Sequence, residues 1–211
     1  MTAPGDRPAP WRGPVDDWHA AAPPPATDAA GAALTLFELS RRARFGVKGR
    51  RALQWLVKAG IAVPAANNRA EPAGAELLVA RLGPGEALLL ATGSGGAGRL
   101  AEVARLLERK PPAGAYAVPR QDMSAWFRVE GAGAPALFAA LCAVDLRPAR
   151  FSAGAVAQTS VALQSAIVVR DDRDADLGFD MLTDFASGAY LWGVLVDQLA
   201  TLGGNVVAPT A

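Results

Sequence analysis

A glycine-rich segment is the first feature of the chain that could bind a cofactor. The run Gly93-Ser-Gly-Gly-Ala-Gly98 matches G-x-G-x-x-G, the pattern that brings the start of a helix to a dinucleotide pyrophosphate. It follows an apolar segment, and Asp122 lies roughly where the ribose-binding acid is expected. However, the apolar segment belongs to a predicted hairpin rather than to a strand-helix-strand unit, and the corresponding loop before Gly188 has no glycine pattern. We therefore predict a strand-to-helix loop that binds no nucleotide.

A cluster of basic residues could meet a phosphate, a folate glutamate tail or an acidic neighbouring subunit. The alternative is a solvated strand edge and first helical turn, where charge discourages aggregation through the edge. Nucleic-acid binding would interleave aromatic side chains with the basic ones, and only Phe45 does so. We take Arg41 and Arg42 as candidate partner-interface residues. The cluster comprises Arg41, Arg42, Arg44, Lys48, Arg50 and Arg51.

The residue types that usually carry catalysis or bind metals are few. Cys142 and His19 are the single cysteine and histidine, and a structural zinc site needs four nitrogen or sulfur ligands. Cys142 lies on the apolar side of a helical segment, so we interpret it as a core residue. Four aspartates between positions 171 and 176 flank Arg173 but lack the glycine and distal glutamate of a calcium loop, which predicts a solvated turn. We predict no catalytic, cofactor-binding or metal-binding residue.

The charge balance narrows the classes of partner. The chain has 21 basic and 20 acidic residues, whereas proteins that bind nucleic acids or acidic membranes usually carry a clear basic excess. A single cysteine excludes an internal disulfide framework and suits a reducing compartment. No apolar run reaches the roughly 18 residues of a membrane span, and the first residues have no hydrophobic signal core. We expect a soluble cytoplasmic protein that binds neither nucleic acid nor membrane.

Residues 1–31 are predicted to form an extended arm. Seven prolines disfavour helices and sheet ladders there, and the composition cannot bury enough apolar surface to fold alone. Trp11 and Trp18 stand in this arm. They are either chance aromatics in a solvated tail or anchors on a partner, since tryptophan supplies large contact areas at interfaces. On the second interpretation, Trp11 and Trp18 are candidate partner-interface residues.

The body of the chain contains a repeat. The segment RFGVKGRRALQWLVKAGI, from Arg44, aligns with WFRVEGAGAPALFAALCA, from Trp126, at a constant offset (127 − 45 = 82). Each segment has alternating apolar residues, then a glycine turn, then an amphipathic helix. The pattern predicts equivalent core positions in the two segments. These are Phe45, Val47, Trp55 and Leu56 in the first segment and Phe127, Val129, Leu137 and Phe138 in the second.

Each repeat continues with a predicted strand pair and a second helix. The strand pairs cover 77–92 and 156–184, and the helices cover 98–110 and 188–200. Each half therefore has the order β-α-β-β-α. The predicted fold class is α+β, with a duplicated domain over 32–211, halves at about 32–112 and 113–205, and antiparallel or mixed sheets.

Five short motifs of the body together form a family pattern. They are Phe45-Gly-Val-Lys-Gly49, Leu82-Gly-Pro-Gly-Glu86-Ala-Leu-Leu, Asp122-Met-Ser, Phe127-x-Val-x-Gly131 and Cys142-Ala-Val-Asp145-Leu-x-Pro148-x-x-Phe151. The last motif is the most specific. Through these motifs, residues 45–198 resemble the gamma-subunit family of heterotetrameric sarcosine oxidase. The resemblance implies the duplicated α+β fold of the aminomethyltransferase folate-binding domain.

The resemblance also implies a role inside a complex. Complexes of this family contain alpha, beta, gamma and delta subunits, demethylate a secondary amine oxidatively with FAD, FMN and NAD, and transfer the one-carbon unit to tetrahydrofolate. It implies that flavins, folate and zinc belong to the other subunits. The chain would then be a non-catalytic structural subunit of an oxidoreductase, with alpha, beta and delta subunits as partners. Glu86 and Asp122 match acidic positions of relatives, but this match does not identify them as folate ligands.

Three alternatives stay open at this point. N-methylglutamate dehydrogenase complexes contain a similar small subunit, so neither the amine nor the choice between oxidase and dehydrogenase is fixed. A free-standing folate-binding protein of the aminomethyltransferase type would need a folate-contacting acid and a base in the cleft between the halves. An accessory protein for nucleic acid or Fe–S assembly would show salt-dependent RNA binding.

Overall fold

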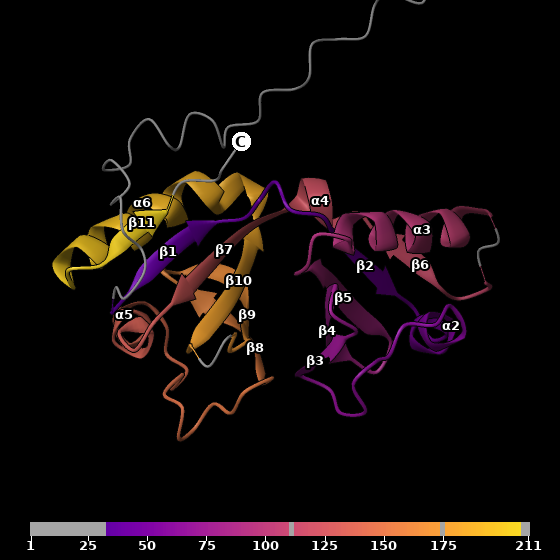
Figure 1. The fold of residues 1–211 in the computed structure, drawn as a ribbon, viewed down its shortest axis with the longest axis horizontal. Helices are drawn as coiled ribbons and strands as arrows, with labels where there is room; N and C mark the ends of the chain where they lie inside the picture. Colours follow the sequence, from indigo (N-terminus) through magenta and orange to yellow (C-terminus); the bar gives the residue numbers. More distant parts are fainter. Residues whose placement is uncertain (1–32, 110–111, 174–175, 208–211) are drawn as a thin grey trace, which may run out of the picture.

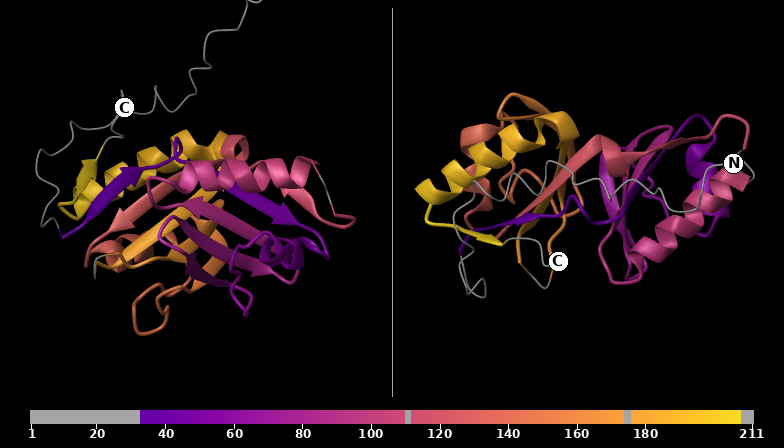
Figure 2. Two further views of the ribbon diagram at one scale, coloured as in Figure 1. Left: turned by 45° about the vertical axis from the view of Figure 1, so that its right-hand side comes forward. Right: turned by 90° about the horizontal axis from the view of Figure 1, so that it is seen from above.

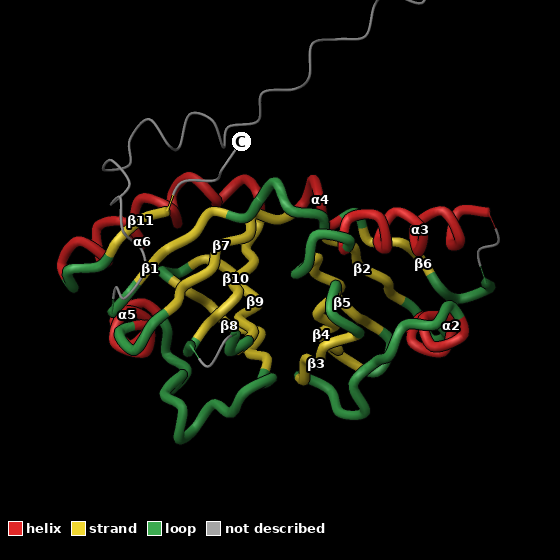
Figure 3. Tube along the Cα trace, viewed as in Figure 1, coloured by secondary structure: helices red, strands yellow, loops and turns green. Residues whose placement is uncertain are grey.

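The computed structural model of the protein describes residues 33–109, 112–173 and 176–207. The predicted arm, with Trp11, Trp18 and His19, lies outside these residues. The described chain forms two β-sheets that pack face to face, with helices on the outer face of each sheet (Figures 1 and 3). None of its helices combines the length and apolar character needed to cross a bilayer.

The larger sheet has six strands and the smaller sheet has five. In spatial order the six strands are β11 (Asn205–Val207), β1 (Thr35–Glu38), β7 (Ser124–Glu130), β10 (Gly178–Asp184), β9 (Gln164–Arg170) and β8 (Val156–Val161). The five are β3 (Arg69–Ala73), β4 (Leu77–Gly83), β5 (Glu86–Ala91), β2 (Arg44–Lys48) and β6 (Tyr116–Val118). Among these strands only β1 and β11 pair in parallel. The predicted α+β class with antiparallel or mixed sheets is confirmed.

The helices cover the sheets with apolar stripes at helical spacing. In α3 (Gly96–Arg109) the buried side chains Leu100, Val103 and Leu107 face the five-stranded sheet, which α2 (Ala52–Lys58) also covers. The six-stranded sheet is covered by α5 (Ala134–Leu141) and α6 (Gly188–Thr201). The short helix α4 (Arg120–Met123) and the 3-10 turn η1 (Phe185–Ser187) complete the described elements.

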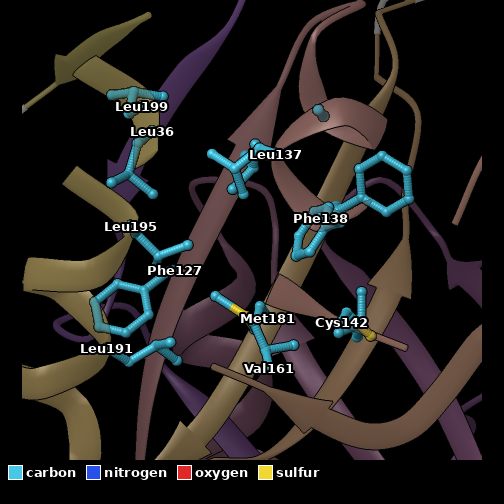
Figure 4. Close-up of a cluster of buried hydrophobic side chains, with 14 of the residues drawn as sticks. Leu36, Phe127, Leu137, Phe138, Cys142, Val161, Met181, Leu191, Leu195 and Leu199 are labelled. Atoms are coloured by element: carbon cyan, nitrogen blue, oxygen red, sulfur yellow. The ribbon is translucent and has the colours of Figure 1, made fainter. Parts of the chain in front are cut away.

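The predicted core positions of both segments are in the core. Val47 and Leu56 are fully buried under the helices of the five-stranded sheet, where Phe45 and Trp55 are partly buried. The four second-segment positions are fully buried in the larger cluster, part of which Figure 4 shows. A third cluster lies between the two sheets and joins their inner faces. Its members include Leu78, Leu88, Leu90, Trp126, Val169 and Leu182.

The strand prediction needs two corrections. The predicted strand pair at 156–184 is three strands, because β8 and β9 are separate strands joined at Ala162 and Leu163. Neither residue is a usual turn former, so the sequence carried no signal for this turn. Strands β1, β3, β6 and β11 were also not predicted. Strands β1, β6 and β11 have only three or four residues, and the β3 sequence RAEPA has weak strand propensity and contains proline.

One strand of each half pairs in the sheet that holds most of the other half. Strand β1 precedes β2 in the chain but pairs with β7, with Leu36 opposite Val129. Strand β6 precedes β7 but pairs with β2, with Val47 opposite Ala117. The predicted halves therefore do not correspond one to one with the sheets. The chain passes between the sheets at 39–43 and at 119–123 (Figure 2), so separating the two sequence halves would break the β1–β7 and β2–β6 ladders.

The two crossing segments are joined by the buried side chain of Arg44. Its guanidinium donates to the carbonyl oxygens of Ser40 (2.7 Å) and Arg42 (2.9 Å) in one segment. In the other segment it donates to the carbonyl oxygens of Arg120 (3.0 Å) and Gln121 (2.8 Å). It also donates to the carbonyl oxygen of Ser124, the first residue of β7. Burial lowers the pKa of Arg44 to about 10, although the charge of Glu38 raises it, so the side chain is protonated at neutral pH. The interpretation of the whole basic cluster as solvated is wrong for this residue.

We expect Arg44→Met to lower the free energy of unfolding by about 3 kcal/mol or more, because several buried carbonyl groups lose their donor. Arg44→Lys should restore little, since one ammonium cannot reproduce a planar set of donors. Urea denaturation followed by circular dichroism measures the effect. Arg42→Met is the control and should change stability by less than about 0.5 kcal/mol, since its side chain is exposed. Equal stability of Arg44→Met and wild type would contradict this role.

Candidate functional site

The glycine-rich loop and the first two basic residues meet at one cavity of about 420 Å³. The loop connects the end of β5 to the start of α3, and the basic residues follow the first crossing segment toward β2. The cavity is lined by Arg41, Arg42, Ala43, Ala91, Thr92, Gly93, Ser94 and Ala97.

The glycines of this loop make room for Glu76. The backbone N–H of Gly95 donates to the Glu76 carboxylate at 2.7 Å, and the N–H groups of Thr92 and Gly93 donate to its carbonyl oxygen at 2.9 and 3.2 Å. A Cβ at Gly96 would lie 2.6 Å from that carbonyl oxygen, closer than real Cβ contacts. Glu76 therefore fills space that a larger residue in the loop would take.

This arrangement differs from a dinucleotide site in charge and in topology. At a phosphate-binding helix start, free N–H groups face an anion. Here a carboxylate already accepts from one of them, and its negative charge disfavours a phosphate. Strand β5 has antiparallel neighbours on both sides, β4 and β2, so the strand-helix-strand context is missing. Asp122 lies on α4, where its charge raises the pKa of Arg44.

The remaining basic residues serve different purposes. Glu86, the first residue of β5, pairs with Lys48 (3.1 Å) and also accepts from Arg120 (2.8 Å). Glu86 is thus held in ion pairs that connect β2, β5 and α4. Arg41 and Arg42 have exposed side chains beside the cavity, and they remain candidate partner-interface residues.

The space between the sheets is largely filled by side chains. Trp126 is fully buried there among leucines from both sheets. Two openings remain at its margins, of about 290 Å³ beside Arg120 and Met123 and about 270 Å³ beside Arg69 and Arg170. Both lie below the roughly 300–1,000 Å³ that is usual for small-molecule pockets. The main role of this layer is therefore to pack the two sheets together, and its openings are small for a ligand site.

A buried ionic network occupies the inner face of the six-stranded sheet. Asp180, on β10, accepts from Trp126 Nε1 (2.8 Å), Arg128 (2.8 Å) and Arg173 (3.0 Å). Burial raises the pKa of Asp180, and the two arginines act against that rise. Burial alone would lower the pKa of Arg128, but Asp180 and Glu130 raise it. The network ties β7, β10 and the segment after β9 together.

The acidic turn is part of this network, which corrects the prediction of a solvated turn. Asp171 accepts from Arg173, and Asp172 accepts from Arg170 in a two-pronged contact (3.0 and 2.7 Å). Asp174 lies outside the described residues. Within the described ranges, no three or more histidine, cysteine or acidic side chains gather in a way that could hold a metal ion.

Cys142 is buried at the end of α5, as predicted for a core residue (Figure 4). Its Sγ lies 3.8 Å from the hydroxyl of Thr159, and its backbone forms a bridge with Val161. It packs in the larger core cluster with Phe138 and Phe151. The residue therefore serves packing.

Comparison with known proteins identifies the fold. No protein-family profile matches the chain, and no curated protein matches it in sequence. Among solved structures, it is similar to a chain of heterotetrameric sarcosine oxidase from Corynebacterium sp. U-96, solved in complex with pyrrole 2-carboxylate. The TM-score is 0.72 at 22% identity, over 95% of this chain and 98% of that chain. The fold is aminomethyltransferase-like.

The chain is also similar in structure to the glycine cleavage system aminomethyltransferase T from Bartonella henselae, which supports this description of the fold. The TM-score is 0.60 at 18% identity, over 83% of this chain and 48% of that chain. The described protein thus spans about half the length of this aminomethyltransferase. At these identities the likeness establishes the fold.

Four polar residues that hold the fold together were not predicted from the sequence: the partly buried Glu76 and the buried Arg44, Arg128 and Asp180. A signal was present for the last two. Asp180 interrupts the apolar run Gly-Phe-Asp-Met-Leu, and Arg128 stands between Phe127 and Val129. A charge inside a strand that is buried on both faces indicates a buried ion pair.

We expect opposite effects from two alanine substitutions in the loop. Gly96→Ala should lower the free energy of unfolding by about 2 kcal/mol, because its Cβ would collide with Glu76 and Ala91. Gly98→Ala should raise it by up to about 1 kcal/mol, because a Cβ there meets no neighbour and alanine favours the helix. Paired urea titrations measure both changes. A loss of stability in Gly98→Ala, or none in Gly96→Ala, would contradict the packing role.

The same geometry predicts that the chain binds no NAD. Isothermal calorimetry with the full chain should show no saturable heat at micromolar to millimolar NAD, because Glu76 already accepts from the loop. Saturable binding that disappears in Gly95→Val would show that the motif is a functional cofactor site.

Proposed function

We propose that this protein is a non-catalytic assembly subunit of a multi-subunit, flavin-dependent amine oxidoreductase of the sarcosine oxidase type. One observation carries the proposal: the fold matches a chain of a heterotetrameric sarcosine oxidase over nearly the whole of both chains. The match to aminomethyltransferase T leaves about half of that enzyme without a counterpart. The fuller match to the sarcosine oxidase chain supports a subunit of such a complex over a transferase.

The proposal includes a duplicated origin of the halves 32–112 and 113–205. Ala52 N–H donates to Gly49 O, and Ala134 N–H donates to Gly131 O, at 3.0 Å in both cases. These positions differ by the same offset as the sequence repeat (134 − 52 = 82; 131 − 49 = 82). Gly49 and Gly131 both have positive φ, 128° and 107°, a conformation that glycine adopts readily. Equivalent turns support the duplication, which gives the subunit two similar bodies joined by exchanged strands.

The use of polar groups supports a role in assembly. Glu76 accepts from the glycine loop, Glu86 is held by two cations, and Asp180 lies within a buried ionic network. These charges contribute to packing the fold. We infer that FAD, FMN, NAD, zinc and tetrahydrofolate are bound by the alpha, beta and delta subunits, and that Arg41 and Arg42 contact an acidic surface of one of them.

Two alternatives lead to distinct observations. In an N-methylglutamate dehydrogenase complex the chain would have the same role with another amine. A free-standing folate-binding protein is favoured by one feature, the cavity of about 420 Å³ beside Arg41 and Arg42, whose guanidinium groups suit a ligand carboxylate. Titration of the chain with a folate analogue tests this alternative.

We expect the affinity-tagged chain, purified from its native host, to bring with it larger subunits that carry flavin. Addition of sarcosine or N-methylglutamate should bleach the flavin absorbance, and the amine that acts faster identifies the type of complex. Flavin-free chain that binds a folate analogue with micromolar affinity would instead support the free-standing protein and contradict our proposal.

We also expect that deleting residues 1–31 weakens assembly without unfolding the body. Trp11→Ala and Trp18→Ala should each reproduce part of the loss, because truncating an interface tryptophan typically costs about 2 kcal/mol or more of binding energy. Recovery of flavin-bearing subunits is compared with the melting temperature of each isolated variant. Equal recovery by truncated and full-length chains would contradict docking of the arm. A lower melting temperature of the truncated chain would mean that the arm packs on its own body.

A further inference from the structure

The hairpin formed by β8 and β9 ends in an unusual turn. Val161 and Gln164 are the last paired residues, so Ala162 and Leu163 alone make the turn. Their φ angles are 47° and 66°. Positive φ at both central residues is what a two-residue hairpin turn requires, and such turns favour Asn-Gly because a Cβ is strained there. Leucine is therefore an unfavourable residue at this position, because its backbone is strained at positive φ.

Burial does not offset this strain. Leu163 is 91% exposed, the highest exposure among the large hydrophobic side chains of the described residues. The isolated chain is therefore destabilised twice at this residue, by the apolar side chain exposed to water and by the strained backbone. Strain that persists without a structural benefit indicates a function at that point.

The turn is held firmly in place. Ala162 N–H donates to the carbonyl oxygen of Leu141 at the end of α5 (2.8 Å). The Ser187 hydroxyl, in η1, donates to the Gln164 side chain (2.7 Å). Both sides of the turn are therefore fixed to neighbouring elements. Because the turn on either side of Leu163 is held, presenting the leucine to a partner costs little backbone entropy.

The surroundings of the turn define what it can meet. No charged residue occurs from Phe151 to Val169, between Arg150 and Arg170. The opening of about 290 Å³ beside the hairpin is lined by Thr159 and Ser165 and, farther from the turn in sequence, by the charged residues Arg120 and Asp184. The hairpin itself carries no charge, so its projecting leucine fits an apolar pocket of a partner rather than an acidic or basic surface.

We propose that Leu163 is an anchor that inserts into an apolar pocket of a large subunit of the oxidoreductase complex. The inference rests on the proposed function, which supplies the large subunit as partner. The Leu163 side chain is 91% exposed in the free chain, and binding removes it from water. The strain of the free chain is thus linked to assembly.

The test compares three variants of the full chain for binding to the purified complex of the other subunits. Leu163→Asn relieves strain and removes the apolar group. It should raise the melting temperature of the isolated chain and weaken binding roughly thirtyfold, the ratio that corresponds to a loss of about 2 kcal/mol. Ala162→Asn relieves strain but keeps Leu163, so it should raise the melting temperature and leave affinity unchanged. Val57→Asn alters a side chain that is 60% exposed on α2, and it should leave affinity unchanged.

The outcomes separate this inference from the proposed function. Equal affinity of Leu163→Asn and wild type overturns the anchor and leaves the proposed function standing. No binding by the wild-type chain overturns both. Sedimentation velocity of the isolated chain completes the test, since a dimer that Leu163→Asn dissociates would show that a second copy, not a large subunit, receives the leucine.

Discussion

The guanidinium of Arg44 lies where the chain passes between the two sheets, and the arrangement of both sheets depends on it. It donates to carbonyl groups of both crossing segments, 39–43 and 119–123, and to that of Ser124. Ser40 and Ser124 are buried, so their carbonyl groups need a donor from the protein. Those segments place β1 in the six-stranded sheet and β6 in the five-stranded sheet. The two sheets are thereby joined as one unit.

This constraint explains where the other polar residues are used. Trp126 fills the layer between the sheets, and its indole N–H needs the buried carboxylate of Asp180, which in turn needs Arg128 and Arg173. Glu76 and the loop glycines fix the start of α3 in a similar way. The polar groups in these networks are bonded to one another. The groups that a partner could contact therefore lie at the surface, and they include the charged Arg41 and Arg42 and the apolar Leu163.

Much of the architecture could be predicted because it follows from periodic patterns. The alternation around Val47 and Val129 and the helical spacing from Leu137 predicted the core positions and the strand-turn-helix order around them. The strand exchange could not be predicted, because β1 and β6 have only four and three residues and their patterns do not specify a partner. Arg44 was hidden among five other basic residues, and only the fold shows that it is buried. The Ala162-Leu163 turn lacks every residue that usually marks one, because its sequence does not follow backbone preference.

Native mass spectrometry of the chain purified with its partners tests the central claim most directly. If the protein is an assembly subunit, the intact mass should correspond to one copy of this chain with single copies of three other subunits, and flavin should be released only from subunits other than this one. A spectrum that shows the chain alone, as a homodimer, or itself carrying flavin would contradict the account.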